Sequence, residues 1–142
     1  MLEEIRQQPA ALERPLREEL PGIERLKARL SAERPRLIVL AARGTSDNAA
    51  QFGRYLLEIL TGIPVSLAAP SIFTLYQSSV DFRDVLCVAI SQSGESTDTN
   101  LVLERAREQG ALTVGITNEP ASSLARMAEF TFLVRADREG AD

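Results

Sequence analysis

Histidine and tryptophan are both absent from this 142-residue sequence, and cysteine occurs only once. Without histidine, the chain cannot by itself build a Ser-His-Asp or Cys-His catalytic arrangement. A single cysteine cannot form an intramolecular disulfide, and it offers too few soft ligands for a zinc site. Any chemistry of this chain must therefore use carboxylates, hydroxyls, amides, lysine or arginine, and we expect neither a metal nor a cofactor.

A long apolar run and an excess of positive charge are also missing. No segment approaches the ~20 apolar residues that cross a bilayer, and the N-terminal residues include no apolar signal stretch. The net charge of -4 disfavours binding to nucleic acid or to an anionic membrane, because both need clustered lysine and arginine. We therefore predict a cytoplasmic protein whose partners include neither nucleic acid nor a membrane.

Composition changes near residue 35. Residues 1–34 are rich in Glu, Arg and Leu, and Pro9, Pro15 and Pro21 interrupt them, which predicts two or three short helices that begin near the prolines. The seven acidic and seven basic residues of this segment balance, which disfavours a DNA-binding helix-turn-helix. We interpret it as a helical appendage, and residues 35–142 as one domain of ordinary size.

Short apolar runs alternate with amphipathic stretches after residue 35. The five runs are residues 37–42, 65–68, 85–90, 112–116 and 130–134. Each is short enough for a strand and apolar enough to be buried on both faces. The alternation predicts an α/β fold with a mainly parallel sheet and helices on both sides, whose ligands gather at the carboxyl ends of the strands. Cys87 lies inside the third run, so we expect it in the core.

The stretches between the runs have helical patterns. Five apolar residues have the spacing of one helix face: Phe52, Tyr55, Leu56, Ile59 and Leu60. Gly62 follows them as a C-terminal stop. A second helix is predicted over residues 97–109, with Val102 among its inward positions, and shorter helices over residues 71–78 and 122–127.

Hydrogen-bonding side chains are concentrated where the third run meets the following helix. The segment reads Ser91-Gln92-Ser93-Gly94-Glu95-Ser96-Thr97-Asp98-Thr99. A helix N-terminus offers unpaired N–H groups and the positive end of its dipole, so it can hold a phosphate without lysine. Capping of the helix needs only one such residue. We therefore favour phosphate binding by Ser91, Gln92, Ser93 and Ser96 over capping alone, with Glu95 either turned away or in contact with a sugar hydroxyl.

A similar loop follows the first run and reads Arg43-Gly44-Thr45-Ser46-Asp47-Asn48. Arg43 could pair with an anion or with Asp47, while Thr45 and Ser46 could bind sugar hydroxyls or cap the helix. Two such loops at neighbouring strand ends would form one cleft. Neither loop contains the G-x-G-x-x-G motif of dinucleotide sites or a Walker motif.

Residues 41–48 and 90–99 together resemble the motifs of the SIS (sugar isomerase) domain family. The similarity is highest to the isomerase half of the glucosamine-6-phosphate synthases and to their deaminase-like relatives. It implies a flavodoxin-like three-layer αβα sandwich with a five-stranded parallel sheet, which binds phosphorylated sugars or amino sugars. By position, it assigns the phosphate to the four residues named above and the sugar to Gly44, Thr45 and Ser46, with Arg43 as a candidate anion contact.

Two residues differ from the synthase pattern. Arg43 stands where the synthases more often have cysteine, which moves the sequence toward the deaminase-like branch or an uncharacterised one, and Ser96 replaces a threonine. Family enzymes usually join two SIS domains and place the catalytic glutamate and lysine in the second domain and the C-terminal tail. No segment here matches those parts. We therefore expect the first domain of a two-domain protein and assign no catalytic residue to this chain.

The leading hypothesis is the substrate-binding domain of an aldose-ketose isomerase, a deaminase or an aminotransferase. Its substrate would be a hexose 6-phosphate such as glucosamine 6-phosphate or fructose 6-phosphate. A positioned carboxylate of the intact enzyme would move a proton between C1 and C2 without a cofactor. The alternatives are a non-catalytic phosphosugar-sensing module of a regulator and a structural module without a ligand. The resemblance also implies a homodimer.

Overall fold

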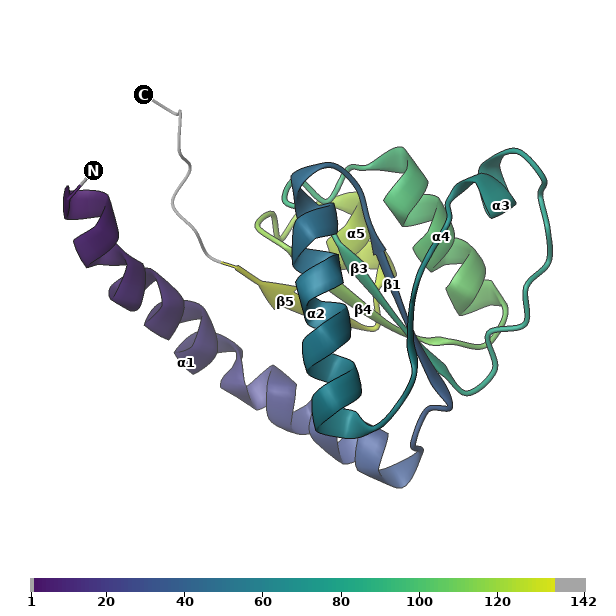
Figure 1. Ribbon diagram of the computed structural model, residues 1–142, viewed down its shortest axis with the longest axis horizontal. Coiled ribbons are helices and arrows are strands. Elements are labelled where there is room, and N and C mark those ends of the chain that lie inside the picture. The colour runs from purple at the N-terminus through teal and green to yellow at the C-terminus, as the bar shows by residue number, and fades with distance from the viewer. Residues whose placement is uncertain (1, 135–142) are drawn as a thin grey trace.

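The computed structural model describes residues 2–134, with the side chains of residues 17–134 apart from Thr45, Asp47, Leu60 and Thr74. Its centre is a sheet of five parallel strands in the order β2-β1-β3-β4-β5 (Figure 1). The strands are β1 (Leu37–Ala42), β2 (Val65–Leu67), β3 (Val85–Ile90), β4 (Leu112–Thr117) and β5 (Phe130–Leu133). This is the flavodoxin-like strand order, so the predicted fold class is confirmed.

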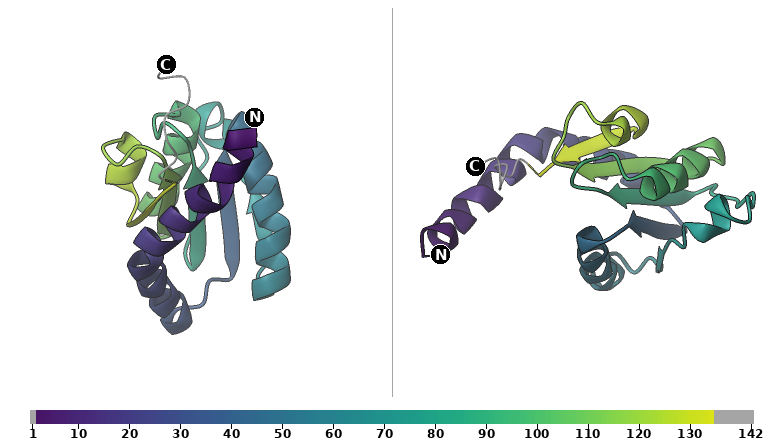
Figure 2. Two further views of the ribbon diagram at one scale, coloured as in Figure 1. Left: turned by 90° about the vertical axis from the view of Figure 1, so that its left-hand side faces the viewer. Right: turned by 90° about the horizontal axis from the view of Figure 1, so that it is seen from above.

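Helices cover both faces of the sheet (Figure 2). The helices of the described residues are α1 (Leu2–Ala32), α2 (Thr45–Thr61), α3 (Ser71–Thr74), α4 (Thr97–Glu108) and α5 (Ser123–Met127). Side chains of α1 and α2 pack in one hydrophobic cluster, while those of α3, α4 and α5 pack in the other. The chain therefore forms the expected three layers, with a predicted helix over residues 71–78 shortened to four residues.

The central strand β3 supplies both hydrophobic clusters because successive strand residues point to opposite faces of a sheet. Val85, Cys87 and Ala89 pack toward α4, whereas Leu86 and Val88 pack toward α1 and α2. Cys87 is fully buried, as the apolar run predicted. The continuous apolar character of this run therefore reflects burial on both faces, as expected for the middle strand of a parallel sheet.

The N-terminal segment forms one 31-residue helix, α1, where the prolines predicted two or three short ones. A proline inside a helix removes one backbone hydrogen bond. The surrounding Glu, Arg, Leu and Ala residues are strong helix formers that offset this loss. The C-terminal half is also held by the sheet, because Leu26 and Leu30 pack on the core and Arg29 pairs with Glu129 at 2.9 Å. The prediction of separate helices was therefore wrong.

The apolar face of α2 points away from the sheet. A stripe of this kind usually faces the core, yet the exposed fractions are 66% for Phe52, 71% for Tyr55, 43% for Leu56 and 77% for Ile59. The inner face instead carries Ala50 and Leu57. Small residues on this inner face let the helix lie close to the strands, and the larger apolar residues are left outside.

We expect Cys87 to be unreactive in the folded protein. Burial raises the pKa of its thiol to about 12, so almost no thiolate forms near pH 8. Ellman's reagent at that pH should label the native chain only as it unfolds and should label the urea-unfolded chain at once. Rapid labelling of the native protein would contradict the placement of Cys87 in the core.

Candidate functional site

The structure brings the two polar loops together at the carboxyl ends of β1 and β3. These strands are paired so that Ala42 lies opposite Ile90, and each loop starts at the next residue. The Arg43 guanidinium forms an ion pair with the Asp98 carboxylate in the first turn of α4. The two loops therefore lie next to each other at these strand ends, and of the second segment only Asp98 lines the open pocket described below. The partner of Arg43 is Asp98, while the side chain of Asp47 lies outside the described residues.

The loop between β3 and α4 turns its carbonyl groups into the protein. The Gln92 carbonyl accepts hydrogen bonds from the Asn118 N–H at 3.0 Å and from Thr117 Oγ1 at 3.1 Å. The Gly94 carbonyl accepts from the Leu124 N–H at 3.1 Å and from Asn100 Nδ2 at 3.0 Å. The C=O and N–H of a planar trans peptide point in opposite directions. The N–H of Ser93, which shares a peptide with the Gln92 carbonyl, therefore points away from the protein body.

Gly94 allows this loop to lie directly on the start of α5. Its φ is 71°, in the region that favours glycine. A Cβ at this position would lie 2.2 Å from Ser122 Oγ and 2.4 Å from Ser122 Cβ. The positive φ and the close approach both require glycine here. The close neighbour is the buried Ser122.

Helix α4 begins beside this loop with a serine as its capping residue. Ser96 is the N-cap: its Oγ accepts from the Thr99 N–H at 3.4 Å and donates to Thr99 Oγ1 at 3.1 Å. The next N–H groups, those of Thr97 and Asp98, belong to the first turn, where a helix has no internal acceptors for them. The positive end of the α4 dipole lies at the same place.

The other predicted phosphate residues differ in their exposure. Ser91 is buried, and its Oγ accepts from the Gly94 N–H at 3.1 Å. Ser93 is exposed, and its Oγ accepts from the Glu95 N–H at 3.1 Å. A serine hydroxyl that accepts one hydrogen bond keeps its own proton for donation. The exposed Gln92 and Ser93 side chains are therefore the better placed of the set to contact an anion, whereas Ser91 and Ser96 also shape the loop.

An open cleft of about 630 Å³ lies next to Asp98. Its volume falls within the ~300–1,000 Å³ of typical ligand pockets. The lining residues are Ala42, Arg43, Gly44, Ala68, Ala69, Pro70, Ser71 and Asp98. Residues 68–71, which follow β2, were missed by the sequence analysis. The only signal for them was that they follow a strand end beside the first loop.

The predicted sugar-binding residues follow β1. Gly44 lines the cleft with a φ of 62°, and no atom lies within 4 Å of the position where its Cβ would be. The backbone conformation therefore requires this glycine, and packing does not. Thr45 is the first residue of α2, but its side chain lies outside the described residues, and Ser46 is half-buried.

Glu95 is turned away from the cleft. Its two carboxylate oxygens accept from the Ser123 N–H at 2.8 Å and from the Ser123 hydroxyl at 2.7 Å. These hydrogen bonds hold the pKa of the Glu95 carboxyl below its usual value. Of the two positions left open by the sequence, turned away or on a sugar hydroxyl, the structure shows the first.

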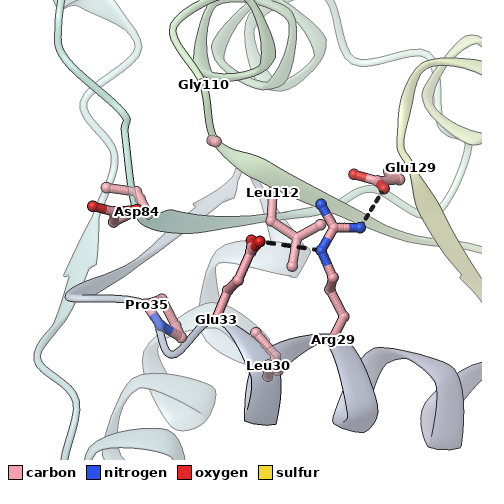
Figure 3. A pocket seen from close by; sticks show the side chains of 10 residues that line it. Arg29, Leu30, Glu33, Pro35, Asp84, Gly110, Leu112 and Glu129 are labelled. Atoms are coloured by element: carbon pink, nitrogen blue, oxygen red, sulfur yellow. Dashed lines mark hydrogen bonds and ion pairs between the residues drawn. The ribbon is translucent and has the colours of Figure 1, made fainter.

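A second pocket lies at the opposite end of the sheet, between α1 and the starts of β3 and β4 (Figure 3). Arg29 is held there by Glu129 at 2.9 Å and by Glu33 at 3.7 Å. Asp84 adds a third carboxylate to the lining, so negative charge exceeds positive. This pocket does not suit a phosphate.

Within residues 2–134, no helix has the length and apolar character needed to cross a membrane, and no metal-ligating group of three His, Cys, Asp or Glu residues occurs among them.

Comparison with known proteins identifies the family of this fold. Residues 32–141 match the SIS domain family. The chain belongs to the SIS domain family. It is 40% identical to glutamine–fructose-6-phosphate aminotransferase [isomerizing] 1 of Arabidopsis thaliana over 98% of this chain and 22% of that protein. It is 35% identical to the corresponding Aquifex aeolicus enzyme over 98% of this chain and 23% of that protein.

Solved structures share the SIS fold of this chain. A candidate phosphosugar isomerase from Silicibacter pomeroyi DSS-3 has a TM-score of 0.91 at 34% identity, over 96% of this chain and 42% of that one. The C-terminal domain of glucosamine-fructose-6-phosphate aminotransferase from Francisella tularensis has a TM-score of 0.79 at 31% identity, over 97% and 40%. This SIS chain thus spans under a quarter of the length of the two curated enzymes above.

The Gly94→Ala substitution should destabilise the SIS domain by roughly 2–4 kcal/mol, because it combines a positive φ with a clash against Ser122. Urea unfolding measures this change. Gly53→Ala is the matched control, because its Cβ would meet only Leu40 Cδ1 at 3.7 Å within a regular helix. The control should be neutral or stabilising by up to ~1 kcal/mol. Equal effects of the two substitutions would contradict the described loop.

Proposed function

We propose that this chain is the phosphosugar-binding domain of an SIS enzyme that acts on a hexose 6-phosphate, as an isomerase, a deaminase or an aminotransferase. One observation carries the proposal: the loop after β3 points its carbonyls inward at the N-terminus of α4. This leaves the Ser93 N–H facing outward beside the first-turn N–H groups of α4, and such donors suit a phosphate. Residues 1–34 would then be a helical appendage to a single domain.

The phosphate would lie against the N–H groups of Ser93, Thr97 and Asp98, with the Ser93 hydroxyl and the Gln92 amide as further donors. This placement explains how an acidic protein can hold an anion, since the field is local and needs no lysine. The sugar would extend along the cleft toward Gly44 and residues 68–71, where backbone groups and Ser71 are available for hydroxyl contacts.

Binding and positioning would be the contribution of this domain to catalysis. Transfer of a proton between C1 and C2 needs a carboxylate within hydrogen-bond reach of those carbons. Glu95 is the only glutamate of the loop, and both its oxygens are engaged by Ser123. Asp98, the carboxylate that lines the cleft, is paired with Arg43. The base would therefore come from a part of the enzyme that this chain does not match. Amino sugar chemistry is supported by the names of the relatives, among them the Arabidopsis thaliana aminotransferase.

A non-catalytic sensor of phosphosugars remains the second hypothesis, and no observation favours it. The relatives described above are enzymes, and residues 1–34 carry balanced charge. A cytoplasmic location is part of the proposal, since sugar phosphates of this kind are intracellular metabolites.

Titration calorimetry with glucosamine 6-phosphate, fructose 6-phosphate and unphosphorylated glucosamine tests the proposal. We expect binding only of the phosphorylated sugars. The double variant Ser93→Ala and Ser96→Ala should weaken that binding at least tenfold. It should also lower stability by ~1 kcal/mol per lost cap-type hydrogen bond, a few degrees in Tm.

Thr61→Ala is the matched control for this loss of stability. Thr61 Oγ1 donates to the Leu57 carbonyl and accepts from the Ile63 N–H at the far end of α2. The control should lose similar stability and keep its affinity. Wild-type protein that binds glucosamine as well as its 6-phosphate, or a double variant with unchanged affinity, would refute the phosphate site.

We also propose that the chain forms a homodimer through the outer face of α2. This face presents four large apolar side chains, Phe52, Tyr55, Leu56 and Ile59, and no charged residue lies among them in the helix spacing. An apolar, uncharged face can pack against its own copy around a two-fold axis without like-charge repulsion. A helix that is apolar on both faces is typically buried on both.

The variant Phe52→Glu with Ile59→Glu should convert the dimer to a monomer in analytical ultracentrifugation, because two-fold symmetry would bring like charges together. Leu75→Glu with Tyr76→Glu is the control, since these residues are equally exposed, at 74% and 75%, but follow α3. A wild-type monomer at all concentrations, or dissociation by the control alone, would contradict the proposed surface.

A further inference from the structure

The cleft contains one positive and one negative side chain, and they are paired with each other. Of the residues that line the cleft, only Arg43 and Asp98 are charged. The Arg43 side chain is 67% exposed, the Asp98 side chain is 29% exposed, and the ion pair joins the loop after β1 to the first turn of α4. The pair therefore connects the proposed sugar side of the cleft to its proposed phosphate side.

Asp98 is at first sight an unfavourable residue for a phosphate site. A carboxylate in the first turn stabilises a helix through the dipole. It also places a negative charge where the phosphate dianion would bind, and like charges a few ångströms apart repel strongly in a partly buried cleft. The other carboxylate of the loop, Glu95, is removed from the cleft by its hydrogen bonds to Ser123. Asp98 is therefore the carboxylate whose charge the site must offset.

We propose that Arg43 is a positioning residue that neutralises Asp98 while a sugar phosphate is bound. Its guanidinium stays on the carboxylate, cancels the repulsion between Asp98 and the phosphate, and holds the two loops in one arrangement. This inference rests on the phosphate site proposed above. In this proposal Arg43 acts through its ion pair with Asp98 and does not contact the ligand.

The geometry favours neutralisation over direct binding of the phosphate by Arg43. If the guanidinium left Asp98 to bind the phosphate, the carboxylate would face the dianion without a counter-charge. The gain of one ion pair would be offset by the loss of another and by the new repulsion. An arginine that stays in place avoids this exchange and is always charged at neutral pH.

A double-mutant cycle separates the two roles. The dissociation constant for glucosamine 6-phosphate is measured for Arg43→Gln, Asp98→Asn and the double variant. Neutralisation predicts that Arg43→Gln weakens binding roughly five- to tenfold and that adding Asp98→Asn restores affinity to within about twofold of the wild type. Direct binding by Arg43 predicts a double variant that stays as weak as Arg43→Gln, which would overturn the inference.

The pH dependence gives a readout that a purely structural role would not change. The second pKa of a sugar phosphate is ≈ 6, so the mean negative charge of the ligand is smaller by about 0.7 at pH 5.5 than at pH 7.5. The defect of Arg43→Gln should therefore shrink at pH 5.5, because the repulsion scales with the ligand charge. A defect of equal size at both pH values would also overturn the inference.

Two further results keep the test decisive. Arg43→Lys preserves the charge and should retain affinity for glucosamine 6-phosphate within about threefold, even if Arg43→Gln proves too unstable to study. A loss of affinity as large as that expected for Arg43→Gln would count against neutralisation. Wild-type protein that binds no sugar phosphate would instead refute the proposed function, and the inference with it. Normal wild-type binding without restoration in the double variant refutes the inference alone.

Discussion

The contact between Gly94 and the start of α5 is the constraint on which the candidate site depends. A Cβ at Gly94 would overlap Ser122. Because glycine has no Cβ, the loop after β3 can lie close enough to the β4–α5 segment for its carbonyls to accept hydrogen bonds from N–H groups and side chains there. Those bonds turn the peptide dipoles so that donors face outward beside the N-terminus of α4. The proposed anion site at the start of α4 would thus depend on the packing of Gly94 against Ser122.

The same arrangement would let a chain with net charge -4 hold a phosphate at the proposed site. Each carboxylate near the loop has a defined partner: Glu95 is bound by Ser123, and Asp98 is paired with Arg43. Uncharged N–H donors then determine the field that a ligand meets. The acidic pocket beside Arg29 at the other end of the sheet has no comparable set of donors, which is consistent with the rule that ligands bind at the carboxyl ends of parallel strands.

Much of the fold could be predicted because buried parallel strands are continuous apolar runs, and the bounds of β1 and β3 agree with those runs. The hydroxyl-rich loop could be located for the same reason, since it directly follows β3. The single helix α1 could not, because the surrounding helix formers offset the local effect of the prolines and Leu26 and Leu30 hold its C-terminal half on the core. Nor could the outward apolar face of α2 or the pairing of Arg43 with Asp98, which depend on contacts between distant segments.

The central claim is that phosphate lies on the N–H groups at the start of α4, and an amide NMR titration with glucosamine 6-phosphate tests it most directly. The account predicts that the largest shifts occur at the amides of Ser93, Thr97 and Asp98, and that unphosphorylated glucosamine does not reproduce them. Shifts confined to residues around Arg29 and Asp84, at the other end of the sheet, would contradict it.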